Sequence, residues 1–362
     1  MWEKFVIIKG VKMGSIDAVK QTQPVNYQKI SKPVNKPVKD VGTSDNSPVI
    51  FRTKAYERDF AAQYTVAKLN FWRDPDKPSP TPQTPNLTSS GSGTDTTYRI
   101  GDPTRPNIQH DNGFLQNPNN PNDPNPISTI NPTQADIDFY NDQLSQVTWA
   151  QRIDNFNIPF RDEDDTARRL SNGIEAYRHF LEGNGADRTF SYDEFVNEDP
   201  SGQTILNNAI ADTQRGAEDL YNQMIARDPS LAGKPITFDI TSGAITVGGS
   251  DAYPYPDTEN WQKAIGGHPI WNSATVTVTP PSEAGGKPQF SMEYTLHAED
   301  RYNFNPDQED IATGAPDAIR GRLEQTGLAH QYTQYATLNR DVSWTQGDIS
   351  GTTETNNPNE GR

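Results

Sequence analysis

The chain has 362 residues, no cysteine and a formal net charge of −16. The absence of cysteine excludes disulfides, thiolate zinc sites and a cysteine nucleophile, and the acidic charge argues against binding DNA or RNA through phosphate neutralisation. Only 32% of the residues are hydrophobic, and 29 prolines and 26 glycines interrupt the sequence, so we expect the folded core to use only part of the chain.

Residues 1–133 are predicted to be a flexible, Pro/Asn-rich arm and linker. Residues 29–39 alternate lysine, proline and valine, and residues 117–126 repeat Asn-Pro, which forms neither helix nor sheet ladder. Composition leaves open whether this arm is a plain spacer or serves delivery. The apolar run Phe5–Ile8 is shorter than the roughly 7–15 residues of a Sec signal. We expect a protein made in the cytoplasm without a Sec signal and moved out by another route.

Residues 134–230 are predicted to form a small helical domain. Thr133 is a suitable N-cap, and apolar residues follow it at steps of three and four. Two more helices are expected, over about 164–182, with Gly183 as C-cap, and over about 204–227. Each has one apolar face.

Residues 231–345 are predicted to form an antiparallel, partly open β-barrel, which makes the fold class α+β. From Lys234 onward the apolar period changes from helical spacing to two. The expected elements are a hairpin of 236–240 with Ala244–Val247, strands over Thr275–Thr279 and Phe290–Leu296, and a last helix over about 317–338. Residues 346–362 are expected to be a frayed polar tail.

Acids, an arginine, a tyrosine and amides crowd together after the strand Phe290–Leu296, in residues 297–306. These residue types suit a site that holds a metal ion and an oxyanion. A polar turn after an edge strand is the alternative interpretation.

Two stretches resemble the colicin M family of bacteriocins: His179–Arg188, which ends in Gly-Asn-Gly-Ala-Asp-Arg, and Asp300–Asn305, which is Asp-Arg-Tyr-Asn-Phe-Asn. The family shares a Gly-Asn-Gly-Ala-x-Arg turn after a helix and an aspartate-x-tyrosine-aspartate signature after the strands of a short open β-barrel. The resemblance spans about residues 165–345. It implies an antibacterial toxin that hydrolyses the peptidoglycan precursor lipid II between undecaprenyl and pyrophosphate with Mg²⁺, and a cognate immunity protein.

Carried over residue by residue, Asp300 matches the first aspartate, Tyr302 the tyrosine and Asn305 a recurring amide. Asn303 stands where the family has its second aspartate, and Glu309 falls where it has a histidine. An amide cannot act as a base, although it can ligate a metal or orient water. We expect Asn303→Asp to keep or raise activity.

The departure at Glu309 leaves several residues open. Glu309 can replace the histidine, or an insertion can bring Arg320, Arg322 or His330 into its place. Tyr302 either contacts the pyrophosphate or fills the strand end, and His297 either contributes to the site or lies on the surface. The predicted catalytic residues are Asp300, Tyr302, Asn303, Glu309 and Arg320; Asn305, Arg322 and His297 are predicted to bind substrate, and Asp300 and Glu309 to hold Mg²⁺.

Two other functions compete with hydrolysis. Asn303 and the missing histidine permit a non-catalytic binding module, and the Asn-Pro arm permits a structural component of a secretion or phage-like particle. For delivery to the target-cell periplasm, an injection apparatus is favoured over an outer-membrane receptor, because the sequence shows no compact receptor-binding domain.

Overall fold

The computed structural model describes residues 87–89, 96–115, 130–156 and 169–356, which fall within one compact unit. Most of the expected arm and linker, the start of the helix expected from about residue 164, and the end of the expected tail lie outside the described residues. Among the residues described, no helix is both long and apolar enough to cross a membrane.

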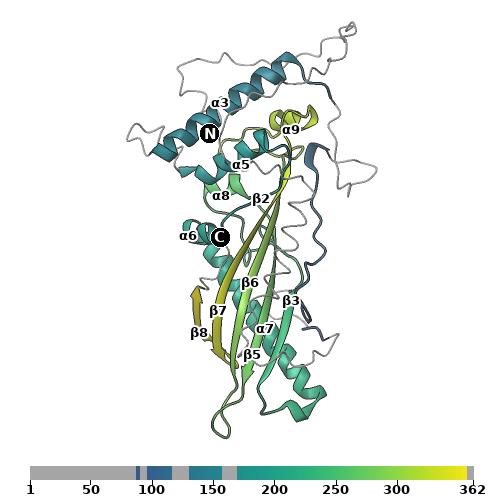
Figure 1. The fold of residues 1–362 in the computed structure, drawn as a ribbon, viewed down its shortest axis with the longest axis vertical. Coiled ribbons are helices and arrows are strands. Elements are labelled where there is room, and N and C mark those ends of the chain that lie inside the picture. The colour runs from purple at the N-terminus through teal and green to yellow at the C-terminus, as the bar shows by residue number, and fades with distance from the viewer. Residues whose placement is uncertain (1–86, 90–95, 116–129, 157–168, 357–362) are drawn as a thin grey trace, which may run out of the picture. The chain divides into compact units, whose positions relative to one another are not determined.

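Helices and one mostly antiparallel, open sheet make up the described part of the chain, which confirms the α+β class (Figure 1). The sheet there has eight strands: six follow the order β1-β3-β5-β6-β7-β2, β4 pairs with β5, and β8 pairs with β7. The partly open barrel stays a prediction. The strands are β1 Tyr98–Ile100, β2 Arg188–Thr189, β3 Ile236–Ser242, β4 Ile245–Thr246, β5 Pro269–Thr279, β6 Gln289–Tyr302, β7 Tyr332–Thr345 and β8 Asp348–Asn356.

Local capping chemistry sets where the helices begin. The first starts directly after Thr133, as predicted, because Thr133 N donates to Asp136 Oδ2 at 2.8 Å and Asp136 N donates to Thr133 Oγ1 at 3.3 Å. The helices are α3 Gln134–Phe156, α5 Ser171–Glu182, α6 Tyr192–Glu198, α7 Pro200–Arg227, α8 Glu259–Ala264 and α9 Ala318–Gln325, with 3₁₀ turns η2 Gly113–Leu115 and η3 Pro229–Leu231.

Asp199 explains why α7 starts four residues earlier than the sequence predicted, at Pro200 rather than Thr204. Its carboxylate accepts hydrogen bonds from Ser201 N at 2.9 Å and from Thr258 N at 2.8 Å, so it caps α7 and also fixes the turn before α8. Burial raises the pKa of Asp199, but these hydrogen bonds outweigh burial and hold it below its usual value.

One face of the sheet carries the hydrophobic core. Phe290, Met292, Tyr294 and Leu296 are buried along β6, as their alternation predicted, and they share one core cluster with residues of α7. Tyr221 of α7 meets Phe290 edge to face, with 5.4 Å between ring centroids. The core therefore joins residues of the predicted helical range to residues of the predicted sheet range.

Three expectations differ from the structure. Ile245 of β4 pairs with Ile270 of β5, so β3 and β4 do not form a hairpin. The last helix, α9, ends at Gln325, and the second half of the expected helix is the start of β7. The expected frayed tail contains β8, which pairs with β7.

Residues 105–115, here called the strap, lie against the end of β6 on the face opposite the core. Arg105 Nε donates to Glu299 Oε2 at 2.7 Å, and His110 Nε2 lies 2.7 Å from Glu299 Oε1. Phe114 N donates to Phe304 O at 3.2 Å. The strap therefore contacts the end of β6, where several of the predicted site residues lie (Figure 1).

Candidate active site

The two stretches that carry the resemblance meet at one end of the sheet. Arg188 of β2 is the register partner of Gln334 in β7, and Asp300 of β6 is the register partner of the same glutamine from the other side. Register partners on neighbouring strands project to the same face. Arg188, Gln334 and Asp300 therefore form a row across three strands. Gln334 Nε2 donates to Asp300 Oδ2 at 2.8 Å and to Ala264 O at 2.6 Å.

Asp300 is a buried carboxyl group with 7% of its surface exposed. Burial raises its pKa to about 7, and the Asp111 carboxylate acts in the same direction, while the hydrogen bond from Gln334 acts against them. At neutral pH such a carboxyl is divided between its two protonation states. This is the property that a proton-transfer group needs.

Tyr302 packs into an aromatic cluster at the strand end. Its ring stacks on Tyr332 with 5.1 Å between centroids and lies 6.0 Å from Phe180, while His179 meets Tyr332 edge to face at 4.5 Å. Burial raises the pKa of Tyr302, and the charge of Arg320 only partly offsets this. The hydroxyl therefore stays protonated at neutral pH, and the ring packs at the strand end; a contact of the hydroxyl with pyrophosphate stays a prediction.

Asn303 and Asn305 tie the loop after β6 to its surroundings. Asn303 Nδ2 donates to Asp111 Oδ1 at 2.8 Å, which joins the loop to the strap. Asn305 N donates to Asp317 Oδ2 at 3.3 Å, and Asn305 Nδ2 donates to Asn303 Oδ1 at 3.4 Å. Both amides are thus engaged in holding the chain.

The other predicted polar residues are placed apart. Glu309 is exposed and forms an isolated bridge with Pro316. Arg322 makes a two-bond contact with Asp136 of α3, at 2.5 and 2.9 Å. Arg320 is only 5% exposed, and its guanidinium carbon lies 5.9 Å from the centroids of the Tyr177 and Phe304 rings.

His297 projects from the face of β6 opposite Asp300, because the two are three residues apart on a strand. Its ring stacks on Trp271 with 3.7 Å between centroids, and its Nε2 lies 2.9 Å from Ser273 Oγ. Burial lowers the pKa of His297 to about 3. His297 thus faces away from the core, and its half-buried neutral ring packs on Trp271.

The two expected Mg²⁺ ligands lie in different settings, Asp300 buried and Glu309 exposed. Within the described ranges, no group of three or more His, Asp or Glu side chains is placed to hold a metal ion. Asp300 has the Gln334 amide as its side-chain partner, and Glu309 is exposed in a loop. Mg²⁺ binding by Asp300 and Glu309 stays a prediction.

Sequence analysis missed Gln334 and Lys263. Gln334 fell inside an expected helix, although Tyr332, Ala336 and Leu338 share its period of two. The Lys263 side chain is 8% exposed, lies 3.5 Å from Glu259 and forms an ion pair with Asp310, so it pins the loop after β6 to α8. Burial lowers the pKa of Lys263 to about 8.

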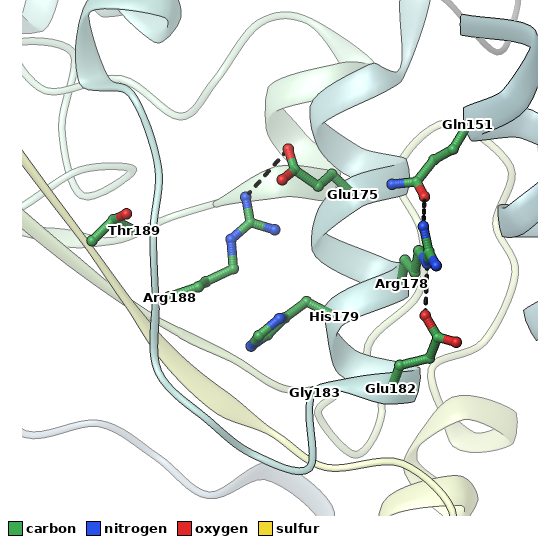
Figure 2. A pocket seen from close by; sticks show the side chains of 8 residues that line it. All are labelled: Gln151, Glu175, Arg178, His179, Glu182, Gly183, Arg188 and Thr189. Carbon is green, nitrogen blue, oxygen red and sulfur yellow. Dashed lines mark hydrogen bonds and ion pairs between the residues drawn. The ribbon is translucent and has the colours of Figure 1, made fainter. Parts of the chain in front are cut away.

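A pocket of about 430 Å³ opens beside the row (Figure 2). Arg188 reaches into it from β2, Gln151 borders it from α3, and the end of α5 supplies the remaining charged wall. In that wall Arg178 bonds to Glu182, and Arg188 points toward Glu175. The pocket and the row share Arg188.

Comparison with known proteins adds no support to the colicin M resemblance beyond residues 179–188 and 300–305. No protein-family model matches the chain, and a search of curated proteins finds no significant similarity.

Proposed function

We propose that the protein is an antibacterial phosphoesterase that hydrolyses lipid II between the undecaprenyl chain and the pyrophosphate. The observation that carries this proposal is the row Arg188–Gln334–Asp300. It brings both resembling stretches, more than 110 residues apart in the sequence, around one buried carboxyl with a pKa near neutrality. A chance likeness of two short stretches would not require them to meet in space.

In the proposed reaction, a water oxygen attacks the phosphorus that carries the undecaprenyl oxygen. The ionised Asp300 carboxylate accepts a proton from this water as the new P–O bond forms. The P–O bond to the undecaprenyl oxygen breaks, and that oxygen takes up a proton and leaves as undecaprenol. The second product is the pyrophosphate-linked aminosugar. Gln334 orients the Asp300 carboxylate through its 2.8 Å hydrogen bond.

The pyrophosphate brings negative charge to an acidic protein, and cations must offset it. Arg188 is the cationic member of the row and its planar fork suits phosphate oxygens. Mg²⁺ would supply further charge neutralisation, and it commonly takes several of its ligands from substrate phosphates and water.

The proposal places the protein's action in the periplasm of a target bacterium, where lipid II is exposed. An injection apparatus or an outer-membrane receptor would deliver it. The producing cell would need a cognate immunity protein.

A non-catalytic binding module is the second candidate, and the position of Asn303 favours it. Where the family has a carboxylate, this chain has an amide that donates to Asp111 at 2.8 Å. Glu309, at the position of the family's histidine, is exposed. Such a protein would sequester lipid II without cleaving it.

The deciding experiment measures release of undecaprenol from lipid II in detergent micelles with excess Mg²⁺. We expect the full-length chain to turn lipid II over and Asp300→Asn to lower the rate by about 100-fold or more. Asp138→Asn, at an exposed carboxylate of α3, is the matched control and should keep the parental rate.

Two outcomes would remove the hydrolase proposal. A folded Asp300→Asn variant with the parental rate would show that this carboxyl transfers no proton in the reaction. A parent that binds lipid II but releases no undecaprenol at any pH would leave the binding module in its place.

A further inference from the structure

We propose that the pocket beside the row is a binding site for the phosphate groups of a phosphorylated, polar small molecule, organised around Arg188. Arg188 projects into it from β2 and lies in the row with Asp300 (Figure 2). The identity of the natural ligand rests on the proposed function. On that function, the pocket receives the pyrophosphate and the aminosugar of lipid II rather than its undecaprenyl chain.

Among the described residues, the Arg188 guanidinium has no carboxylate closer than that of Glu175. Its side chain is 12% exposed, and its buried Nη1 donates no hydrogen bond. Its Nη2 lies 3.8 Å from Glu175 Oε2, which is long for an ion pair, and the Glu175 side chain is 63% exposed. The Tyr332 hydroxyl is a hydrogen-bond partner of Arg188 but carries no charge, so the largely buried guanidinium has no close anionic partner and is suited to an incoming anion.

The wall opposite Arg188 is already fixed in place. His179 Nε2 lies 2.6 Å from Ala186 O, and since a carbonyl only accepts, Nε2 carries the hydrogen and the ring orientation is set. Gly183 leaves no room for a side chain, because a Cβ there would lie 2.5 Å from His179 O. Its φ of −75° shows that space, rather than left-handed backbone, requires this glycine. A preformed wall lowers the ordering cost of binding.

The size and polarity of the pocket define the rest of the ligand. About 430 Å³ falls within the range of small-molecule sites and exceeds the volume of one phosphate group. Gln151 and Thr189 add polar groups to the charged wall. The space beyond the phosphate therefore suits a hydroxylated or amide-bearing group, such as a sugar, better than an apolar tail.

Inorganic pyrophosphate is the probe, and calorimetry on the full-length chain at low ionic strength is the measurement. We expect the parent to bind it and Arg188→Gln to bind about 10- to 100-fold more weakly. Glu175→Gln removes the anion that competes for Arg188, so it should bind roughly two- to fivefold more tightly. Arg215→Gln, a partly exposed arginine of α7 outside the pocket, should bind as the parent does.

Arg188→Gln should lower the affinity for pyrophosphate and Glu175→Gln should raise it. Together with the unchanged affinity expected for Arg215→Gln, this distinguishes binding in the pocket from an effect of net charge. Absence of pyrophosphate binding by the parent overturns the proposal, and so does equal binding by a folded Arg188→Gln variant. If Arg188→Gln does not fold, as judged by thermal unfolding, Glu175→Gln decides: unchanged or weaker binding overturns the site.

Failure of this inference is distinguishable from failure of the proposed function. Pyrophosphate binding that depends on Arg188, without lipid II turnover, supports the site and removes the hydrolase. Turnover that depends on Asp300, with pyrophosphate affinity indifferent to Arg188, keeps the hydrolase and removes the site.

Discussion

Replacing Asp300 by asparagine is expected to stabilise the protein at alkaline pH while abolishing its proposed activity. Folding moves the pKa of this carboxyl from its usual 3.8 to about 7, mainly through burial. Each pKa unit corresponds to about 1.4 kcal/mol, so keeping Asp300 ionised in the native state costs about 4 kcal/mol.

The sign of the pH dependence follows from the raised pKa. The favourable contribution of protonated Asp300 is complete below about pH 4, is lost as the pH rises toward 7, and changes no further above that. Asparagine cannot ionise and can still accept the hydrogen bond from Gln334. The variant should therefore exceed the parent in free energy of unfolding by about 2 kcal/mol at pH 5.5 and about 4 kcal/mol at pH 8.5.

Urea unfolding followed by tryptophan fluorescence at pH 5.5, 7 and 8.5 tests this difference in stability. All three pH values lie above the sequence pI of about 4.7. Asp199→Asn is the control of opposite sign, since hydrogen bonds hold the pKa of Asp199 below its usual value, and that variant should be less stable than the parent at pH 8.5. If Asp300→Asn is no more stable than the parent at pH 8.5, the assignment of a high-pKa buried carboxyl is refuted.

Three further substitutions separate roles that the sequence left together. Asn303→Asp would place a carboxylate beside Asp111, where the Asn303 amide now donates a hydrogen bond at 2.8 Å. Contrary to the expectation from sequence, we therefore expect lower turnover and a loss of about 1 kcal/mol in the free energy of unfolding, measured with urea. Parental values would contradict this. Arg322→Gln, at a partly exposed ion pair, should cost less than about 1 kcal/mol and leave turnover unchanged, and a large rate loss would return Arg322 to the site. His297→Phe keeps the stack on Trp271, and because the pKa of His297 is about 3, the pH profile of turnover between 5 and 8 should not change; a lost inflection would count against a neutral ring.

The sequence predicted a strand correctly where the alternation of apolar and polar residues matches the burial of the two faces of that strand. The first half of β6 alternates apolar and polar residues because one face is core and the other is partly open to solvent. The second half of β6 was not predicted as strand, because the strap buries its outer face and removes the alternation. Glu299 on that face is only 3% exposed although it is charged. No short-range pattern reports a covering segment that lies nearly two hundred residues earlier.

The first half of β7, up to Leu338, was taken for the end of a helix for a related reason. Its inward positions include Gln334 and Arg340, which are buried but polar, and they interrupt the apolar alternation. Arg340 is held there by Asp193 at 2.6 Å and Glu354 at 3.0 Å, from α6 and β8. Buried polar groups are tolerated when partners satisfy them, and partners from distant segments cannot be predicted from one strand.

Sequence analysis singled out Asp300, and the structure places it in a buried row. The neighbours of Asp300 could not be predicted, because they depend on strand register. Gln334 reaches Asp300 only because β6 and β7 pair as they do, and Glu309 lies apart because the chain leaves the sheet after Tyr302. Spacing in the sequence does not determine which side chains meet across strands.

The strap also affects the timing of folding. Arg105 and Glu299 are 194 positions apart in the chain. At a synthesis rate of roughly 5–20 residues per second, the ribosome needs roughly 10–40 s to produce the partner after the strap has emerged. Contacts of such long sequence separation form slowly even in the complete chain. During that interval the strap has no docking surface on β6, and the end of β6 is among the last regions to reach its native environment.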